Sequence, residues 1–304
     1  MVNRKTYILA VLLVLAVVVM ATAAACGSSS GGSEASPSPQ ATSAADIAQQ
    51  VLGHAPTGLA AEIISNGTMI VANDANYAPQ SSVDQATGEL VGFDVDVAKK
   101  AAEILGLKVE FKNPAWETIP TGLDQGKYDV SIGSMTSAID GDKAADETLV
   151  NRWKTMDFTE PYYYTSGQLF VKKGGTQVTG PADLAGKKVG VGAATTYYSW
   201  LKANTDADVK TYTTDADAFP DLRNGNLDFV MTAGPTGQQA ISQGQPFEFS
   251  GAPLYYEDLS MAVKKGEADW VALLNYAVAK MHEDGSLTAM SEKWYSGLDL
   301  TVQQ

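Results

Sequence analysis

Apolar residues fall into short runs and helical repeats that alternate along most of the chain. The runs Met69–Ala72, Leu107–Phe111 and Tyr128–Gly133 have the length of buried strands. Between the first two, the apolar residues of Phe93–Leu105 recur at helical spacing, and Gly106 follows as a helix C-cap. Strands that alternate with helices predict parallel sheets covered on both faces, and therefore an α/β fold.

The alternation continues toward the C-terminus. Further strands are predicted at Gln168–Lys172, Lys188–Val191, Leu227–Met231 and Leu259–Val263. Further helices are predicted at Ile119–Gln125, Tyr197–Lys202, Asp217–Arg223, Pro235–Ile241, Trp270–Asp284 and Leu287–Trp294. With 304 residues, of which 45% are hydrophobic, the chain is long and apolar enough for two globular lobes with cores of their own.

Residues 1–25 have the layout of a secretory signal peptide. Arg4 and Lys5 precede the apolar stretch Tyr7–Met20, and the small residues Ala21–Ala25 lead to Cys26. A cysteine directly after three alanines resembles a bacterial lipobox, in which the thiol is lipidated and becomes the mature N-terminus. The alternative is an uncleaved membrane-spanning helix, because the apolar stretch is just long enough to cross a bilayer. Both interpretations export the rest of the chain.

Two segments separate this region from the main pattern. Residues 26–45 are rich in Gly, Ser and Pro, which predicts a flexible tether. Residues 46–66 carry scattered apolar side chains and predict a short helix before the main fold. Cys26 is the only cysteine, so no intramolecular disulfide can form.

The charge balance excludes some partners. The chain holds 35 Asp and Glu against 21 Lys and Arg, a formal charge of −14, whereas nucleic acids and anionic lipids are bound by clustered cations. The acidic segment Asp140–Glu147 does not have the spacing of a calcium loop and predicts a solvated loop. His54 and His282 are expected at the surface. No nucleic acid, metal or cofactor is predicted.

Seven motifs follow one another between Gly92 and Tyr295. They are GFDVDVAKKAAEILGLKVEF from Gly92, Trp116 with GKYDV from Gly126, MDFTEPY from Met156, DLAGKKVGV from Asp183, Thr195-Thr196, NGNLD from Asn224, and DGSL from Asp284 with EKWY from Glu292. In this order and spacing they resemble the polar amino-acid (family 3) periplasmic solute-binding proteins. The resemblance covers about Thr68 to Gly297.

The resemblance implies a type II periplasmic-binding-protein fold, with two mixed, mainly parallel sheets joined by two hinge strands. It places lobe 1 at residues 67–168 and 262–304, and lobe 2 at residues 169–261. The lobes are expected to close around a small carboxylate-bearing solute, an amino acid or a derivative. The closed, monomeric protein would then meet an ABC permease in the membrane.

Two alternatives share this fold. One is a sensor or receptor subunit. The other is an enzyme that resembles cyclohexadienyl dehydratases, which use a carboxylic acid of lobe 2 as proton donor. That acid would fall near Thr236, and threonine cannot serve as the donor. We therefore predict a binding protein and not an enzyme.

Arg152 is the predicted clamp for the ligand's carboxylate. In the family an Arg lies five residues before the Asp of the Asp-Phe-Thr/Ser-x-Pro-Tyr motif, and five residues before Asp157 is Arg152. A guanidinium offers a carboxylate two parallel donors, which Lys does not. The alternative is a solvated Arg in a charged loop, because extra residues at Ser137–Asn151 could displace it from the site.

Other polar ligands follow from the same resemblance. Gly133, Ser134 and Thr136 occupy a strand end where the family meets the ligand's ammonium and carboxylate. Thr195 and Thr196 occupy the start of a lobe 2 helix and offer hydroxyls and unpaired N–H groups to an anion. Thr195 also suits an ordinary N-cap.

Aromatic side chains are expected to form the walls. Tyr77 and Trp116 match two family positions that cover or stack on the ligand, although either also suits the core. Asp74 matches a position that meets a polar or cationic ligand side chain, and it equally suits a turn cap.

The largest departure from the family lies in lobe 2. The family usually has an Asp five residues after the position of Asp228, where it pairs with the ligand's α-ammonium, and here that position is Ala233. Either another acid such as Asp74 holds the ammonium, or the ligand lacks one, or the ligand is a substituted amine held by aromatic rings. The rings available for this are Tyr197, Tyr198 and Tyr162–Tyr164.

Overall fold

The computed structural model describes residues 43–303, so the predicted signal peptide, Cys26 and most of the predicted tether lie outside the described residues. The helices are α1 (Ala44–Leu52), α2 (Gly58–Asn66), α3 (Phe93–Ile104), α4 (Ile119–Asp124), α5 (Glu147–Thr155), α6 (Thr196–Asn204), α7 (Phe219–Asn224), α8 (Gly234–Ser242), α9 (Ala268–Glu283) and α10 (Ser286–Trp294). Short 3-10 helices are η1 (Trp116–Thr118), η2 (Pro181–Leu184) and η3 (Asp215–Ala218). None of these described helices is long and apolar enough to cross a membrane.

The strands are β1 (Thr68–Ala72), β2 (Asn76–Tyr77), β3 (Ser81–Val83), β4 (Leu90–Val91), β5 (Lys108–Lys112), β6 (Val130–Ile139), β7 (Met156–Phe158), β8 (Tyr163–Lys172), β9 (Lys188–Gly192), β10 (Asp208–Tyr212), β11 (Phe229–Ala233), β12 (Phe247–Phe249) and β13 (Tyr255–Lys264). The main sheet has the order β10-β9-β11-β8-β13-β6-β1-β5, while β2, β3 and β4 form a small separate sheet.

The main sheet is parallel at both ends and antiparallel in the middle. β1 pairs parallel with β5 and β6, and β9 pairs parallel with β10 and β11. β8 and β13 pair antiparallel with each other and with their other neighbours. The predicted α/β fold with two hinge strands is confirmed. Because β8 and β13 each continue through both halves, the two predicted sheets join into one hydrogen-bonded path.

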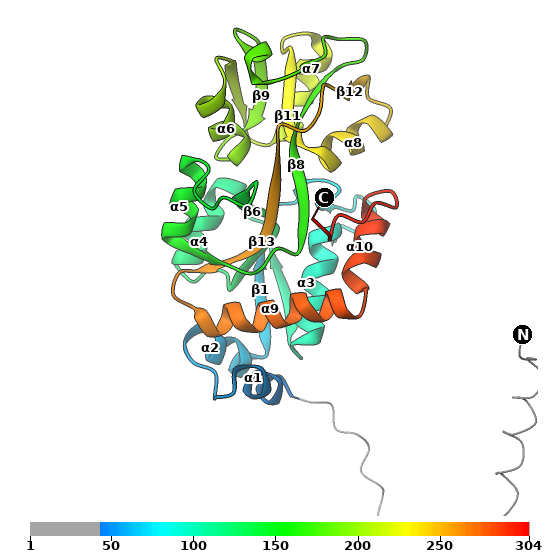
Figure 1. The fold of residues 1–304 in the computed structure, drawn as a ribbon. Helices are drawn as coiled ribbons and strands as arrows, with labels where there is room; N and C mark the ends of the chain where they lie inside the picture. Colours follow the sequence, from blue (N-terminus) through cyan, green and yellow to red (C-terminus); the bar gives the residue numbers. More distant parts are fainter. Residues whose placement is uncertain (1–42, 304) are drawn as a thin grey trace, which may run out of the picture. The chain divides into compact units, whose positions relative to one another are not determined.

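Two lobes are built on the two parallel ends of this sheet (Figure 1). We call lobe 1 the part that contains β1 to β7 with α1 to α5, α9 and α10, and lobe 2 the part that contains β9 to β12 with α6 to α8. β8 and β13 run between them. The largest buried cluster fills lobe 1 around Phe93, Tyr163 and Trp270, and a second fills lobe 2 around Val189 and Phe229.

The segment before the first strand belongs to the lobe 1 core. It forms two helices, α1 and α2, where the sequence predicted one. Ala48 of α1 and Ala60 and Ile63 of α2 are buried in the same cluster as Trp270 of α9. The Thr57 hydroxyl, just before α2, also donates a hydrogen bond to the Asp269 Oδ2, with 2.6 Å between the two oxygens.

The loop before α3 depends on a glycine. Gly92 has φ 141°, and a β-carbon there would lie 2.2 Å from the main-chain oxygen of Gln80. Asp94 and Asp96 then occupy the first turn of α3, where negative charge is favoured by the helix dipole. This start brings Asp94 to the junction between the lobes.

The extra residues of the Ser137–Asn151 segment extend β6 and form most of α5. Asp146 caps this helix, because its Oδ1 accepts the N–H of Leu149 at 2.8 Å. Leu149 is buried, and α5 packs against β6 and β7. The insertion therefore forms a platform that carries Arg152.

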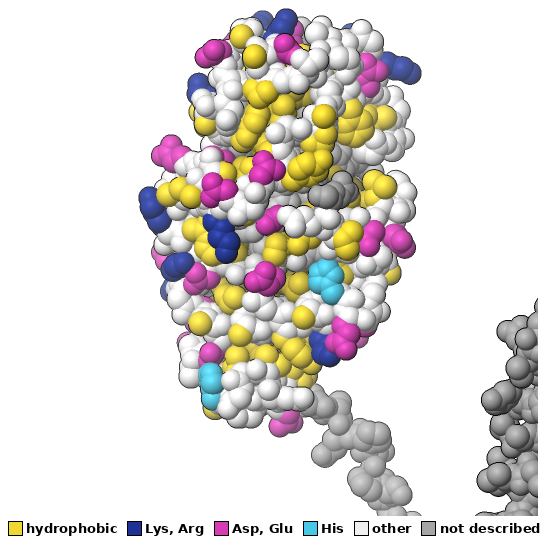
Figure 2. Space-filling model, in the orientation of Figure 1, with side chains coloured by type: hydrophobic (Ala, Val, Ile, Leu, Met, Phe, Trp, Pro, Cys, Tyr) yellow, Lys and Arg dark blue, Asp and Glu magenta, His cyan; other side chains and the backbone are white. Residues whose placement is uncertain are grey.

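The face shown in Figure 2 has Lys and Arg side chains scattered over both lobes. They alternate with Asp and Glu and do not gather into one patch on that face.

Candidate functional site

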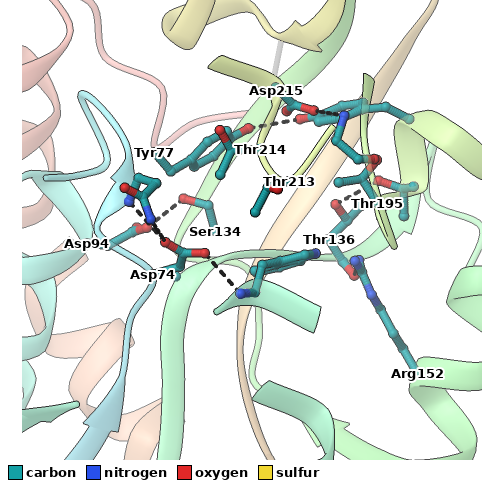
Figure 3. Close-up of a pocket in the computed structure, with 16 residues that line it drawn as sticks. Asp74, Tyr77, Asp94, Ser134, Thr136, Arg152, Thr195, Thr213, Thr214 and Asp215 are labelled. Atoms are coloured by element: carbon teal, nitrogen blue, oxygen red, sulfur yellow. Dashed lines mark hydrogen bonds between the residues drawn. The ribbon is translucent and has the colours of Figure 1, made fainter. Parts of the chain in front are cut away.

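A cavity lies between the two lobes (Figure 3), and the empty space within it, open solvent included, is about 590 Å³. Its lining comes from both lobes and consists of Asp74, Asn76, Tyr77, Asp94, Trp116, Gly133, Ser134, Thr136, Arg152, Gly192, Thr195, Thr196, Tyr197, Thr213, Thr214 and Asp215. Nine of the ten residues predicted to bind ligand are in this lining, and Ala233 is the exception.

Arg152 reaches the cavity from α5 and is 6% exposed. Its Nη1 donates to the main-chain oxygen of Thr136 at 2.9 Å, and its Cζ lies 5.5 Å from the ring centre of Trp116. Within residues 43–303 no carboxylate oxygen approaches it within 4.0 Å. Burial lowers the pKa of Arg152, and the nearby acids Asp146 and Glu257 oppose this shift. A buried guanidinium with donors to spare can receive a carboxylate.

Ser134 and Asp94 form a network at the lobe 1 wall. The Ser134 Oγ donates to Asp94 Oδ2 at 2.6 Å, and the Tyr162 Oη donates to Asp94 Oδ1 at 2.7 Å. The main-chain N–H of Ser134 donates to the same Tyr162 oxygen at 3.0 Å. Burial raises the pKa of Asp94 to about 7, although the hydrogen bonds from Ser134 and Tyr162 oppose it. Much of the polar capacity of Ser134 is thus used within the protein.

Thr195 and Thr196 bring the N-terminal end of α6 to the cavity. The Thr195 Oγ1 accepts the N–H of Tyr198 at 3.2 Å, so Thr195 is the N-cap of α6. The same hydroxyl donates to the main-chain oxygen of Gly192 at 2.8 Å. The preceding Ala194 has φ 58°, a left-handed conformation that favours glycine.

Glu257 of β13 lies behind the cavity wall and is fully buried. Its Oε1 accepts hydrogen bonds from Thr136 and Thr196, both at 3.1 Å, and its Oε2 accepts one from Tyr197 at 2.9 Å. Thr136 belongs to lobe 1, whereas Thr196 and Tyr197 belong to lobe 2. Burial raises the pKa of Glu257 to about 7, against the effect of these hydrogen bonds and of Arg152. One carboxylate thus joins hydroxyls of both lobes.

The two predicted aromatic walls also bridge the lobes. The Tyr77 hydroxyl lies 3.2 Å from the Tyr197 hydroxyl. The Trp116 Nε1 donates to the main-chain oxygen of Ala194 at 3.2 Å. The lobes therefore touch directly over the cavity.

Asp74 is occupied as a turn cap. Its Oδ1 accepts both the main-chain N–H and the Nδ2 of Asn76 at 3.0 Å, and its Oδ2 accepts the N–H of Trp116 at 2.9 Å. These bonds fit the turn-capping alternative, and they position Trp116.

Asp215 occupies the lobe 2 wall. It is 3% exposed and begins η3, directly after β10 and a short turn. Its Oδ1 accepts the N–H of Gly192 at 2.5 Å, and its Oδ2 accepts the Thr232 hydroxyl at 2.9 Å. Ala233 is fully buried in the lobe 2 core, one residue beyond Thr232. Burial raises the pKa of Asp215 to about 6, against the two hydrogen bonds.

Residues 69–297 match the bacterial extracellular solute-binding proteins, family 3. This chain belongs to that family. It is 34% identical to the L-cystine-binding protein TcyJ of Escherichia coli (strain K12) over 254 residues, which cover 83% of this chain and 91% of the relative.

Solved structures of similar proteins also have this two-lobed fold. An ancestral arginine-binding protein bound to arginine aligns with a TM-score of 0.67 and 33% identity, over 75% of this chain and 98% of that one. An ancestral amino-acid-binding protein described as a precursor of cyclohexadienyl dehydratase aligns with a TM-score of 0.67 and 30% identity, over 77% and 98%.

The family assignment agrees with the prediction of a binding protein that is not an enzyme, since the similar proteins bind solutes. Thr236, where a dehydratase acid was considered, is 4% exposed and hydrogen-bonded to Gln80, with 3.3 Å between the Thr236 Oγ1 and the Gln80 Nε2. Within residues 43–303 no cluster of three or more His, Cys, Asp or Glu side chains is arranged to hold a metal ion.

Several cavity residues of this family 3 protein were not predicted as ligand-binding: Asn76, Asp94, Gly192, Thr213, Thr214 and Asp215. Tyr197, also in the lining, was predicted only as an aromatic ring for a substituted amine. Thr213 to Asp215 directly follow β10, a parallel strand, and the carboxyl ends of parallel strands are the usual place for ligands. That rule was the available signal for Asp215.

Proposed function

We propose that this protein captures an α-amino acid outside the cytoplasm and delivers it to an ABC importer. The observation that carries the proposal is the buried Arg152, which faces the same cavity as the hydroxyls of lobe 2. The ligand's carboxylate would bind Arg152 with Thr195 and Thr196 nearby, and its side chain would lie against Tyr77 and Trp116.

Closure is proposed to occur about β8 and β13, with lobe 1 at residues 67–168 and 262–304, to which α1 and α2 are attached, and lobe 2 at residues 169–261. Ligand that touches both lobes binds the closed form more tightly and shifts the population toward it. A decrease in radius of gyration on ligand addition, measured by small-angle scattering, supports closure of a monomer. An unchanged radius would contradict it.

The ligand class follows from the charges and from the relatives. TcyJ is an L-cystine-binding protein, and a structural relative was solved with arginine. Both compounds carry an α-carboxylate and at least one ammonium group. We therefore propose L-cystine and L-arginine as the first compounds to test.

The binding test uses the full chain, purified in mild detergent. Thermal unfolding is followed with L-cystine, L-arginine, other L-amino acids, betaines and dicarboxylates, and calorimetry measures Kd for each compound that stabilises the protein. Stabilisation by an α-amino acid supports the proposal. Stabilisation by betaines or dicarboxylates alone would overturn the assignment to amino acids.

We propose that Cys26 carries a lipid that anchors the protein in the membrane, with residues 26–45 as tether. Mass spectrometry of the protein made in a bacterial host would find a diacylglyceryl group on Cys26 and cleavage before it. The variant Cys26→Ala should lose both the lipid and the cleavage. A wild-type protein that keeps residues 1–25 and carries no lipid would favour the uncleaved helix.

A further inference from the structure

The charges that line the cavity are unequal. Arg152 is the single cation of the lining, whereas Asp74, Asp94 and Asp215 are acids. A ligand carboxylate would neutralise Arg152 and leave the three acids to be accounted for. A buried carboxylate is strongly unfavourable unless hydrogen bonds or a cation compensate it.

Two of the acids are engaged by lobe 1 itself. Asp74 accepts three hydrogen bonds and caps the turn before Trp116. Asp94 accepts hydroxyl protons from Ser134 and Tyr162 and lies in the first turn of α3, where the helix dipole favours it.

Asp215 is the acid of the lobe 2 wall, and it accepts as many hydrogen bonds as Asp94. Each of its oxygens accepts one hydrogen bond, from Gly192 and from Thr232, and a carboxylate oxygen has room for a second. No Lys, Arg or His among residues 43–303 forms an ion pair with it. The lobe 2 wall of the cavity therefore contains a carboxylate that is not paired with a cation of the described residues.

The position of Asp215 is built by its neighbours. A β-carbon added at Gly192 would lie 2.6 Å from the Asp215 Oδ1 and 3.3 Å from the Thr195 Cγ2. The glycine thus leaves space for the carboxylate, and Asp215 lies next to Thr195 at the N-terminal end of α6. A carboxylate held by Thr195 and Arg152 would place the adjacent α-ammonium close to Asp215. Figure 3 shows Asp215 and Arg152 on opposite sides of the cavity.

We propose that Asp215 binds the α-ammonium of the ligand and replaces the countercharge that is absent at Ala233. This inference rests on the proposed function, capture of an α-amino acid. The acid has moved from the end of β11 to the start of η3. Thr232, the residue before Ala233, orients it through a hydrogen bond.

The test compares Asp215→Asn with the wild type in the full chain, by calorimetry with L-arginine and L-cystine. Asparagine keeps the shape and removes the charge, so we expect Kd for the α-amino acid to rise about thirtyfold or more. The control Asp206→Asn makes the same change at an exposed lobe 2 site and leaves Kd unchanged. Melting temperatures without ligand show that the variants are folded.

N-acetyl-L-arginine and N,N′-diacetyl-L-cystine, which lack the α-ammonium, identify the group that is bound. If Asp215 binds the α-ammonium, Asp215→Asn raises Kd for the free amino acids. The Kd of the acetylated compounds, which bind weakly to the wild type, stays unchanged. The inference would be overturned if Asp215→Asn lost affinity equally for the free and the acetylated compounds. It would also be overturned if this variant bound L-arginine and L-cystine with the wild-type Kd.

Arg152→Ala separates the two proposals. If Arg152→Ala abolishes amino-acid binding while Asp215→Asn binds L-arginine and L-cystine with the wild-type Kd, the proposed function stands and the role of Asp215 is wrong. If the wild type binds no α-amino acid, the proposed function itself is wrong.

Discussion

The hydroxyl of Tyr77 in lobe 1 lies 3.2 Å from the hydroxyl of Tyr197 in lobe 2, and Tyr197 in turn donates to Glu257 at 2.9 Å. Because Tyr197 gives its proton to the carboxylate, Tyr77 donates to Tyr197. A chain of hydrogen bonds therefore runs from β2 across the cleft to β13.

Removal of the central hydroxyl should weaken closure. In Tyr197→Phe both hydrogen bonds of the chain are lost, and one of them involves a buried carboxylate. We expect Kd for the bound amino acid to rise about tenfold, since hydrogen bonds to charged groups contribute about 1.5 to 3 kcal/mol. Calorimetry checks this. Tyr198→Phe is the matched control, because the Tyr198 hydroxyl has no hydrogen-bond partner among residues 43–303. Equal Kd for the two variants would show that the chain does not contribute to closure.

Replacement of Arg152 tests the carboxylate clamp. Arg152→Ala should raise Kd well over tenfold, because a desolvated charged partner of the ligand is lost. Arg152→Lys should recover only part of the loss, since Lys lacks the planar fork. Arg223→Ala, an exposed arginine of lobe 2, is the control in the same calorimetric assay. Unchanged affinity in Arg152→Ala would mean that the ligand's carboxylate binds elsewhere.

The sequence predicted the order of strands and helices because buried strands and amphipathic helices have different apolar periods. It also predicted Arg152, whose distance from Asp157 follows the family motif. It did not predict the helix α5 that carries Arg152, since Leu149 is the only buried apolar residue of Glu147–Thr155. The N-cap Asp146 was the local signal for that helix.

Asp215 and Glu257 were missed for a different reason. Asp215 lies in the polar segment TTDAD, which reads as a solvated turn. Its burial depends on Gly192 and Thr232, which belong to other strands. Glu257 is buried where residues of the two lobes meet. Such contacts are set by tertiary packing, which local patterns do not contain.

The backbone conformation of Ala194 predicts that glycine at this position makes the protein more stable. Its φ of 58° is a left-handed conformation that costs a residue with a β-carbon about 1 kcal/mol relative to glycine. Ala194→Gly should therefore raise the free energy of unfolding by about 0.5 to 1 kcal/mol in urea titrations, reduced by the greater freedom of glycine in the unfolded chain. Ala193 does not have a positive φ, so Ala193→Gly should lower the free energy of unfolding. A loss of stability in Ala194→Gly would show that this backbone conformation is not strained.

The buried carboxyl of Glu257 should make the stability of the ligand-free protein depend on pH. Burial raises its pKa from the ordinary 4.5 to about 7. Between these values the folded state binds more protons at this site than the unfolded state. The contribution of Glu257 to the free energy of unfolding therefore falls as pH rises from about 4.5 to 7, by up to about 1.4 kcal/mol per pH unit.

The variant Glu257→Gln isolates that contribution, because the other acids titrate equally in both proteins. Glutamine keeps hydrogen-bonding capacity for Thr136, Thr196 and Tyr197 but does not titrate. In urea titrations from pH 4.5 to 7.5, the wild type should lose stability relative to Glu257→Gln as pH rises. Glu292→Gln, at an exposed site of α10, should show no such trend. A pH-independent difference between wild type and Glu257→Gln would mean that the Glu257 carboxyl titrates as it does in water, and that it does not form the buried contact between the lobes.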